Sequence, residues 1–334
     1  MGRRGWQYQA VRAHRGPGLL PRDDALHPHS DDWWETETAW FSFNVPERRL
    51  GGWLYTQLLP VQGTCNGGAW VWDDSPAGAR YEANHRGLPL PPHVDLRDAA
   101  LPNGNVLRVL EPLTRYELRY ADPGKLEVEL TFDAVMAPHS HPLGVGPFWK
   151  GRHFDQPGRV HGHVALHGER IAVDCFAGRD RSWGPRPMGP DPRSPRRASP
   201  HPRPARPKTG VGYALATASP SESFVAYTLP CEDGTDDVSA GYLWRDGAYA
   251  PLVRGWRRAT FDPSTRWITS LHVEAFDELG RELVADGELV ARHGERGPSG
   301  TGLFRWRWDG TEAWGEDQSY GSEEVWASLG APPA

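Results

Sequence analysis

The chain has 334 residues, of which 37 are Lys or Arg and 43 are Asp or Glu, so its formal net charge is −6 at pH 7. This length fits two domains of ordinary size or one large β domain, and 38% apolar residues are enough to form a core. The 38 glycines and 32 prolines interrupt the chain too often for a mainly helical protein, and no segment approaches the ~20 apolar residues of a membrane helix.

The start of the chain and its cysteines indicate a cytoplasmic protein. The charges of Arg3 and Arg4 are not followed by the apolar run of a secretory signal. Cys65, Cys175 and Cys231 are too few and too scattered for a disulfide framework or a zinc ribbon. We therefore expect a reducing, cytoplasmic setting.

Alternating apolar and polar residues predict β-strands in the first half of the chain. This alternation occurs over residues 41–45 and 54–58. Segments 116–120 and 126–132 also alternate, and the turn signal at 122–124 (Asp-Pro-Gly) lies between them. These two segments therefore predict a hairpin.

Residues 159–177 predict a second hairpin that is rich in histidine on one face. If Gly168 and Glu169 form its two-residue turn, the apolar residues share one face and His163 pairs with Asp174 on the other. A carboxylate that orients an imidazole is a common general acid/base device. The alternative is an exposed His–Asp pair on a solvated sheet face.

The end of this second strand carries a cluster of charges. Asp180 lies between Arg179 and Arg181, and Trp183 follows. The two guanidinium groups could hold Asp180 ionised or bind an anionic group of a ligand. An Arg–Asp network that stabilises a loop corner is the equally open alternative.

The 14 histidines raise the question of a metal site. His139, His141, His153 and the strand with His161, His163 and His167 could supply imidazoles, but zinc or non-haem iron needs three convergent ligands. No glycine-rich phosphate-binding motif opens a helix after a strand. The sequence therefore predicts no metal and no cofactor, and a metal-dependent enzyme that uses the His-rich strand stays a third alternative.

Residues 185–208 divide the chain. Nine of these 24 residues are Pro, seven are Lys or Arg, and Asp191 is the single acid. Such a composition predicts an exposed, disordered linker or loop insertion that could contact anionic partners. Because no aromatic residues are interleaved to stack on bases, we predict no nucleic-acid binding.

Sequence patterns in the second half of the chain also predict β-strands. Asp-Gly turn signals follow short alternating runs within 242–247 and 304–310. We expect six or seven strands on each side of the linker, with short helices only around 31–38 and 322–329. The 16 tryptophans either line an apolar pocket or form ordinary core.

The predicted fold is therefore all-β, with two antiparallel barrels or sandwiches. The expected domains are residues 30–184 and 209–328, joined by the linker 185–208. A barrel of about eight strands can hold one small apolar ligand.

Several motifs resemble a known family. They are Trp33-Trp-Glu35 with Trp40-Phe-Ser-Phe43, His153-Phe-Asp-Gln156, His167-Gly-Glu-Arg170, the run Arg179 to Arg186, and Trp308-Asp-Gly310 with Trp314-Gly-Glu316. Across most of residues 30–327 the chain resembles the two-domain, lipocalin-related proteins of the AttH and carotenoid 1,2-hydratase (hydroxyneurosporene synthase) type. The resemblance implies two packed lipocalin-like barrels with a hydrophobic cavity or an inter-domain cleft. It also implies protonation of a double bond in a polyene or terpenoid, followed by addition of water or of an internal carbon.

These observations predict a cofactor-independent hydratase, isomerase or cyclase that acts on an apolar small molecule such as a terpenoid, polyene or steroid. Asp180, or the pair His163 and Asp174, would be the acid/base, and Trp183 would stabilise positive charge. The predicted ligand-binding residues are Trp183, Arg179, Arg181, His161, His153 and Gln156. The alternative function is a non-catalytic carrier of a hydrophobic small molecule, and the sequence does not predict the oligomeric state.

Overall fold

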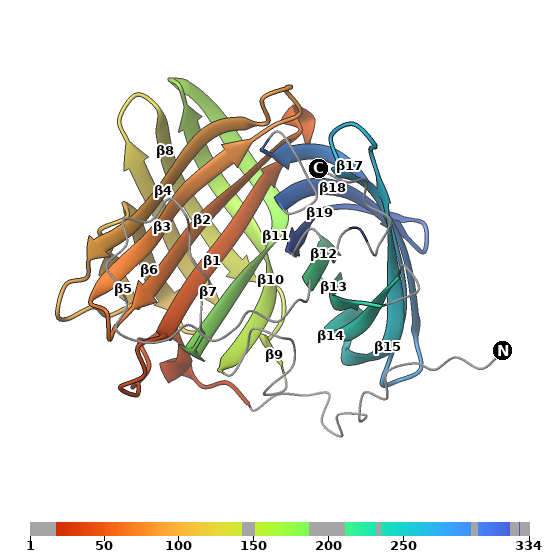
Figure 1. Ribbon diagram of the computed structural model, residues 1–334, viewed down its shortest axis with the longest axis horizontal. Coiled ribbons are helices and arrows are strands. Elements are labelled where there is room, and N and C mark those ends of the chain that lie inside the picture. Colours follow the sequence, from red (N-terminus) through yellow and green to blue (C-terminus); the bar gives the residue numbers. More distant parts are fainter. Residues whose placement is uncertain are drawn as a thin grey trace.

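The computed structural model describes residues 18–141, 151–186, 211–231, 235–294 and 300–320, together with residue 327. Over these residues the protein is nearly all β, as predicted. Strands β1–β11 form one curled sheet, which we call the first sheet, and β12–β19 form a closed barrel, which we call the second barrel. Figure 1 shows the first sheet on the left and the second barrel on the right.

The first sheet has the strand order β4-β3-β2-β1-β11-β10-β8-β7-β6-β5, with β9 paired to β10. Its strands are β1 (Glu35–Val45), β2 (Leu50–Leu59), β3 (Thr64–Trp72), β4 (Ala79–Pro89), β5 (Asp98–Ala100), β6 (Asn105–Glu111), β7 (Arg115–Asp122), β8 (Leu126–Ala134), β9 (His139–Ser140), β10 (Arg152–Leu166) and β11 (Glu169–Pro185). Two short 3-10 helices accompany it, η1 (Pro21–Asp24) and η2 (Pro46–Arg48).

The second barrel closes by pairing its first strand with its last. Each strand pairs antiparallel with the next one in sequence. The strands are β12 (Val211–Ser219), β13 (Glu222–Pro230), β14 (Asp236–Arg245), β15 (Ala248–Phe261), β16 (Ile268–Asp277), β17 (Glu282–His293), β18 (Gly300–Trp308) and β19 (Thr311–Tyr320).

Three of the four predicted hairpin regions are confirmed as β7–β8, β14–β15 and β18–β19, and the fourth is β10–β11. The helix expected around 31–38 is wrong, because β1 begins at Glu35 and pairs on both of its edges, with β2 and β11. Of the other expected helix, at 322–329, only residue 327 is described. The described chain also has more strands than expected, eleven before residue 186 and eight after residue 210.

The predicted linker lies almost wholly outside the described residues. Pro185 ends β11, Arg186 is described, and β12 begins at Val211. The linker at 185–208 and the exact domain boundaries therefore stay predictions.

The register of the β10–β11 hairpin differs by two residues from the predicted register. Leu166 pairs with Glu169, so that His167 and Gly168 form the two-residue turn, with φ values of 51° and 85°. Both central residues of a type I′ turn have positive φ, which suits this pair. A shift of two residues keeps every side chain on its predicted face, and so the face pattern could not reveal it.

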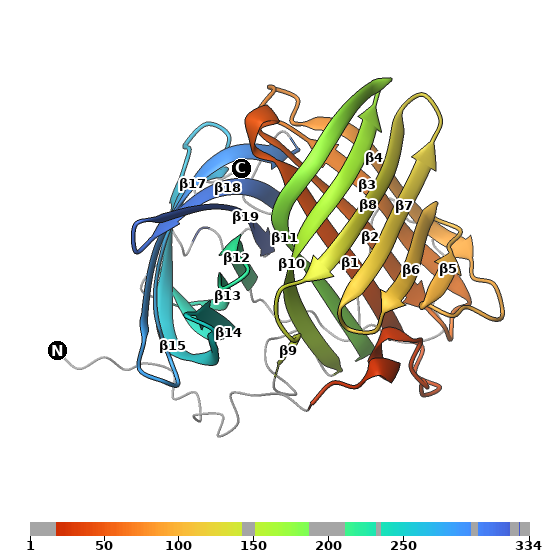
Figure 2. The same ribbon diagram turned by 180° about the vertical axis from the view of Figure 1, so that it is seen from behind.

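Each β unit has its own apolar core, and a third cluster lies between them. The first sheet curls around one core, and the second barrel encloses another. The cluster between them joins Trp40 of β1 to β12 and β13 through Tyr213, Leu215, Val225 and Tyr227. Viewed from behind in Figure 2, β10 and β11 again lie between the rest of the first sheet and the second barrel.

A search of the described residues for a helix long and apolar enough to cross a membrane found none.

Candidate active site between the first sheet and the second barrel

Strands β10 and β11 present one of their faces to the second barrel. Asp155 and Asp180 pair across the β10–β11 ladder, so both project from this face. The face lies close to β12, because a Cβ atom added at Gly178 would be 2.9 Å from Cδ1 of Leu215. Trp40 pairs with Asp180 from the other neighbouring strand, β1. Two carboxylates are therefore brought to the contact between the two units.

Asp155 is buried, with 1% of its surface exposed, and several polar groups hold it. Its Oδ1 accepts a hydrogen bond from the Tyr213 hydroxyl at 2.7 Å and lies 3.2 Å from Nε2 of His153, while Oδ2 contacts Nε2 of His141. Burial alone raises the pKa of a carboxyl group, but the His153 and His141 imidazoles hold the pKa of Asp155 well below its usual range. Asp155 is therefore a fixed negative charge.

His153 connects this carboxylate to both units. Its Nδ1 lies 2.7 Å from Oγ of Ser182 on β11, and its Nε2 lies 2.7 Å from the Tyr227 hydroxyl on β13. Burial and then the Asp155 charge raise the pKa values of Tyr213 and Tyr227 well above their usual range. Both tyrosines therefore keep their protons and act as hydrogen-bond donors.

Two further histidines come from β9 and the residue that follows it. The backbone N–H of His141 donates to the carbonyl of His153 at 3.0 Å, and the His141 ring lies 4.9 Å from the ring of Tyr227. Burial lowers the pKa of His141, which favours its neutral form. Nδ1 of His139 contacts the Tyr249 hydroxyl of β15.

Asp180 has different surroundings from Asp155. Among the described residues, no side chain donates a hydrogen bond to it, and it is only partly buried. Burial raises the pKa of Asp180 to about 6, with the Asp155 charge acting in the same direction and the charges of His153, Arg186 and Arg181 acting against it. This carboxyl group is therefore able to carry a proton near neutral pH.

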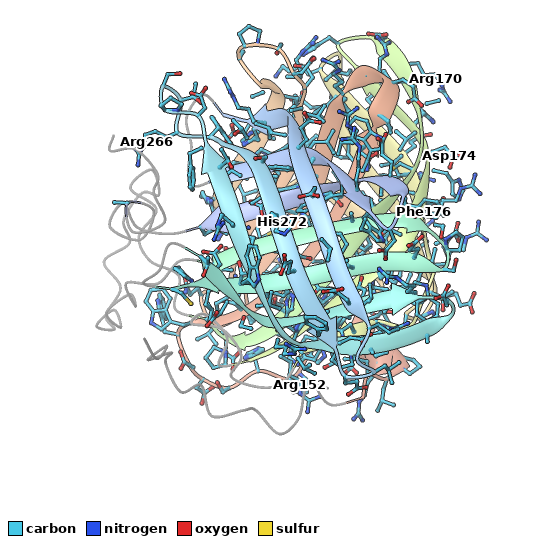
Figure 3. All side chains as sticks on the ribbon, turned by 90° about the vertical axis from the view of Figure 1, so that its right-hand side faces the viewer. Arg152, Arg170, Asp174, Phe176, Arg266 and His272 are labelled. Atoms are coloured by element: carbon cyan, nitrogen blue, oxygen red, sulfur yellow. The ribbon has the colours of Figure 1, made fainter. Side chains whose placement is uncertain are left out.

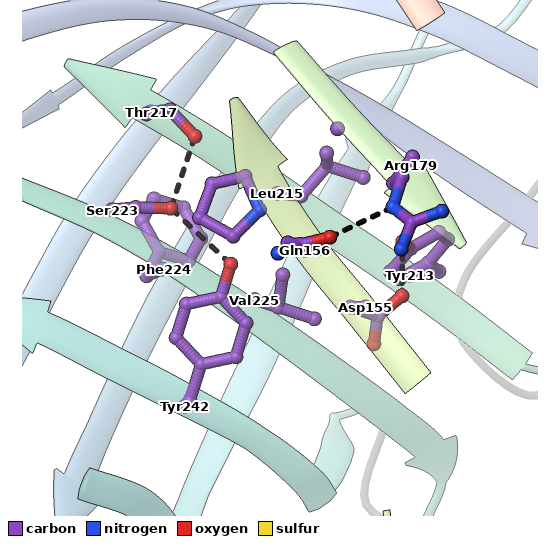
Figure 4. A pocket seen from close by; sticks show the side chains of 12 residues that line it. Asp155, Gln156, Arg179, Tyr213, Leu215, Thr217, Ser223, Phe224, Val225 and Tyr242 are labelled. Carbon is purple, nitrogen blue, oxygen red and sulfur yellow. Dashed lines mark hydrogen bonds between the residues drawn. The ribbon is translucent and has the colours of Figure 1, made fainter. Parts of the chain in front are cut away.

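We call Asp155, Asp180 and the histidines and tyrosines around Asp155 the cluster (His141, His153, Tyr213 and Tyr227). A cavity adjoins this cluster at Asp155 and Tyr213 (Figure 4). Its volume is about 10 Å³, the size that holds one water molecule. Polar atoms on its wall include the Ser223 hydroxyl, which lies 3.0 Å from that of Thr217 and 3.4 Å from that of Tyr242. The full lining consists of Asp155, Gln156, Pro157, Gly178, Arg179, Tyr213, Leu215, Thr217, Ser223, Phe224, Val225 and Tyr242. The cluster thus has a water-sized space beside it.

The structure brings four of the predicted site residues to this region. Asp180 and His153 belong to the cluster, and Gln156 and Arg179 line the cavity. The Gln156 amide also donates to the carbonyls of Leu113 and Met136, at 2.7 and 2.8 Å.

The predicted contact between His163 and Asp174 is wrong. With the observed turn, His163 pairs with Ala172, and Asp174 pairs with His161. The Asp174 carboxylate instead accepts two hydrogen bonds of 2.7 Å from Arg159. Figure 3 shows Asp174 at the outer edge of the molecule, next to Arg170 and Phe176.

His161 and His163 also lie away from the cluster, on the solvent-facing part of β10. Nε2 of His161 is 2.9 Å from the Asp133 carboxylate, and Nε2 of His163 is 3.3 Å from that of Glu129. The His-rich strand therefore does not gather its imidazoles with those of His153 and His141.

Arg179 and Arg181 project from the opposite face of β11 to Asp180, because neighbouring residues of a strand alternate. Arg179 donates to Oε1 of Gln156 at 2.8 Å and lies 3.9 Å from the centre of the Tyr116 ring. Arg181 donates to Oε2 of Glu37 at 2.6 Å. The two arginines therefore do not flank the Asp180 carboxylate, although the Arg181 charge still acts on its pKa.

Trp183 likewise projects away from Asp180. Its ring stacks on that of His27, with centroids 4.0 Å apart and planes 5° apart. The aromatic residue next to Asp180 is Trp40, which pairs with it in the β1–β11 ladder. Trp40, and not Trp183, is therefore placed to stabilise a cation that forms beside Asp180.

The sequence contained a signal for Asp155, which was not predicted, and for its place beside His139, His141 and His153. His139-Ser140-His141 and His153-Phe154-Asp155 both place polar residues two apart, which is the spacing of one face of a strand. The tyrosines of the second barrel gave no comparable signal, because their approach depends on how the two units pack.

Three solved structures share this architecture. A protein of Nitrosomonas europaea described as an AttH is 13% identical, covers 93% of this chain and 98% of its own, and gives a TM-score of 0.54. Kievitone hydratase from Nectria haematococca is also 13% identical, with coverages of 95% and 96% and a TM-score of 0.53. CghA is 13% identical, with coverages of 86% and 88% and a TM-score of 0.56. These likenesses confirm the predicted AttH-like, lipocalin-like fold.

A second structure of CghA, with Sch210972, is 12% identical and gives a TM-score of 0.56, covering 92% of this chain and 94% of its own. No curated protein matches the chain in sequence. The model of a domain of unknown function, DUF7064, matches residues 20–318. The protein therefore belongs to the DUF7064 family.

Proposed function

We propose that the protein is a hydratase- or cyclase-type enzyme that acts on an unsaturated apolar small molecule, such as a terpenoid, polyene or steroid. The observation that carries the proposal is the facing pair of Asp155, held by hydrogen bonds, and Asp180, which accepts none from the described side chains. Asp155 lines a water-sized cavity. Kievitone hydratase, whose name denotes addition of water, has the same fold and supports this choice.

The proposed reaction begins with transfer of a proton from the Asp180 carboxyl group to one carbon of a C=C bond. A C–H bond forms, the π bond breaks, and the neighbouring carbon becomes positively charged. A water molecule at the cavity then adds its oxygen to that carbon. Its surplus proton returns to Asp180, so that the net change is addition of one water.

The cation formed on the way needs stabilisation in a site without bulk water. Trp40 is 2% exposed and lies beside Asp180, and its indole ring is 6.2 Å from the Tyr213 ring. The π-faces of such rings attract cations, and the Asp155 carboxylate adds a negative charge nearby. In a cyclase, an internal C=C bond of the substrate takes the place of water as the nucleophile.

The sizes of the cavities bear on how a substrate binds. The cavity at Asp155 and a second one at Trp183 each measure about 10 Å³. A substrate of the proposed size therefore has to open the contact between the first sheet and the second barrel. A permanent carrier needs a standing apolar cavity, and neither of these two cavities has room for such a ligand.

The experiment is to incubate the protein with a panel of terpenoids, polyenes and steroids in H₂¹⁸O and to analyse the products by mass spectrometry. The expected result is one ¹⁸O-labelled hydrated product. A cyclase gives an isomer of unchanged mass, with one deuterium incorporated when the reaction runs in D₂O. Recovery of every compound unchanged, including any found bound to the protein, would contradict the proposal.

Two variants make this test specific. Asp180→Asn removes the proposed proton donor and should lower turnover by 10²-fold or more, about the contribution of a general acid. Asp174→Asn is the matched control, because Asp174 lies on the same face of β11 as Asp180 but is exposed to solvent. Equal turnover in the two variants would refute the role of Asp180.

A further inference from the structure

Three side chains of the cluster are arranged like the ligands of a metal ion. One potential ligand atom from each of His141, His153 and Asp155 lies within 4.8 Å of the other two. In a tetrahedral zinc site with bonds of about 2.0–2.2 Å, ligand atoms are about 3.4 Å apart. The distance between Nε2 of His153 and Oδ1 of Asp155 is 3.2 Å, and His141 contacts the other carboxylate oxygen. Small side-chain adjustments therefore suffice to place an ion among them.

The pairing of β9 with β10 produces this arrangement. His139 pairs with Asp155, Ser140 pairs with Phe154, and the backbone of His141 bonds to that of His153. A His-x-His segment thus runs antiparallel to a His-x-Asp segment, and alternation places their polar side chains on one face. The pairing of β9 and the residue after it with β10 therefore supplies two imidazoles and one carboxylate.

Groups around the three side chains orient them as they are oriented in metal sites. Oγ of Ser182 lies 2.7 Å from Nδ1 of His153, which fixes the ring and directs Nε2 toward Asp155. The Tyr213 hydroxyl donates to Oδ1 of Asp155 at 2.7 Å. Such outer hydrogen bonds fix the tautomer and direction of metal ligands.

We propose that His141, His153 and Asp155 bind one divalent transition-metal ion of the zinc type between the first sheet and the second barrel. Imidazole nitrogens with one carboxylate suit zinc, iron, cobalt or manganese. Magnesium and calcium prefer oxygen ligands, and magnesium keeps several waters, whereas these three residues are only 1–4% exposed. The inference rests on ligand geometry and does not depend on the proposed reaction.

A metal ion at this place has a clear chemical use. It would activate a water molecule or polarise a substrate oxygen near Asp180. The Tyr227 hydroxyl, 2.7 Å from Nε2 of His153, is a further oxygen within reach of the ion.

The test begins with the full chain, purified without a histidine tag. Its metal content is measured by elemental analysis, and the protein, once stripped with a chelator, is titrated with Zn²⁺ and with Co²⁺. We expect one ion per chain, a rise in melting temperature with Zn²⁺, and visible absorption bands of Co²⁺ bound to nitrogen and oxygen ligands. Absence of binding to the wild-type protein overturns the inference.

Variants locate the ion. His141→Gln should abolish the Co²⁺ bands, and Ser182→Ala, which removes only the partner of Nδ1 of His153, should weaken Zn²⁺ affinity by about 10- to 100-fold. His161→Gln is the matched control, because His161 lies on the same strand as His153 but pairs with Asp133 on the solvent-facing side. Binding that survives in His141→Gln and disappears in His161→Gln would place the ion elsewhere and overturn the assignment.

The outcomes also separate this inference from the proposed function. If no metal binds and Asp180-dependent turnover is found, the metal inference alone is wrong. If metal binds with the expected spectrum but no substrate is converted, the proposed function alone is wrong.

Discussion

Asp155 and Asp180 lie directly opposite each other on β10 and β11 and project toward the second barrel. Tyr213 donates to Asp155, and the imidazoles of His153 and His141 contact it. Asp180 has no such partner among the described side chains. The hydrogen bonds of Asp155 therefore stabilise the fold, whereas Asp180 contributes no such hydrogen bond with the described side chains. A group that is not needed for stability is expected at a functional site.

This difference predicts opposite effects of two similar substitutions. In Asp155→Asn, the Tyr213 hydroxyl and the two imidazoles, which are placed to contact a carboxylate, would meet an amide instead. The substitution should therefore destabilise the protein by about 3 kcal/mol or more. Asp180→Asn removes a partly buried carboxyl group to which no described side chain donates a hydrogen bond, and it should be neutral or stabilising at pH 8. Urea unfolding of both variants at that pH measures the two changes in unfolding free energy. Similar losses in the two variants would show that Asp180 also has a structural partner.

Glu316 of β19 predicts a pH-dependent stability. It is 3% exposed, Trp53 of β2 donates to its Oε2 at 2.8 Å, and burial raises its pKa from 4.5 to about 8. Between these two values the unfolded chain loses the Glu316 proton while the folded protein retains it. The contribution of Glu316 to the unfolding free energy therefore falls as the pH rises from about 5 to 8, by at most ~1.4 kcal/mol per pH unit.

Glu316→Gln should flatten this part of the stability profile, because the amide does not titrate. Glu312→Gln is the control, since Glu312 lies exposed on the same strand and pairs with Arg307 at 3.2 Å. Urea unfolding at several pH values between 5 and 8 measures both slopes. A profile of unchanged slope in Glu316→Gln would mean that other groups cause the dependence.

The sequence predicted the strands well because each strand leaves a local pattern. Alternation identified β1, β2, β7 and β8, and Asp-Gly pairs identified two turns of the second barrel. The pairing of the β10–β11 hairpin was wrong by two residues, since faces repeat with that same period. A pattern of period two cannot distinguish registers that differ by two.

The candidate site was predicted only in part, for a similar reason. Asp180 and His153 were named from local motifs, but their neighbours Tyr213 and Tyr227 come from strands of the second barrel. Trp183 is close to Asp180 in sequence, yet strand alternation directs it to the other face, where it stacks on His27. Contacts between the two units depend on packing, which the sequence patterns of single strands do not record.

Arg257 predicts a large loss of stability within the second barrel. Its guanidinium group is fully buried, donates to Asp236 at 2.8 Å and contacts Asp317. Arg257→Ala leaves two buried carboxylates without their cation and should cost about 3–5 kcal/mol. Arg305→Ala is the control, because its pair with Glu288 is exposed and should contribute about 1 kcal/mol or less. Urea unfolding measures both values, and equal losses would contradict the argument from burial.

The lack of a side chain at Gly178 allows β11 to approach the second barrel closely, so larger residues at this position should destabilise the protein. A Cβ atom there would lie 2.9 Å from Cδ1 of Leu215 and 3.5 Å from the Trp40 ring. The methyl group of Gly178→Ala contacts mainly the flexible end of Leu215, so this variant should lose less than about 1 kcal/mol of unfolding free energy. Gly178→Val has two methyl groups more than Gly178→Ala and should lose about 1–3 kcal/mol.

The double variant Gly178→Val with Leu215→Ala tests whether this contact is the cause. Leu215→Ala alone should destabilise the protein by about 2–5 kcal/mol, because it leaves a cavity. The added valine should partly fill that cavity, so the loss in the double variant should be smaller than the sum of the two single losses. Urea unfolding of the wild type and the three variants gives this coupling energy. Strictly additive losses would show that the strain at Gly178→Val arises somewhere other than the contact between β11 and β12.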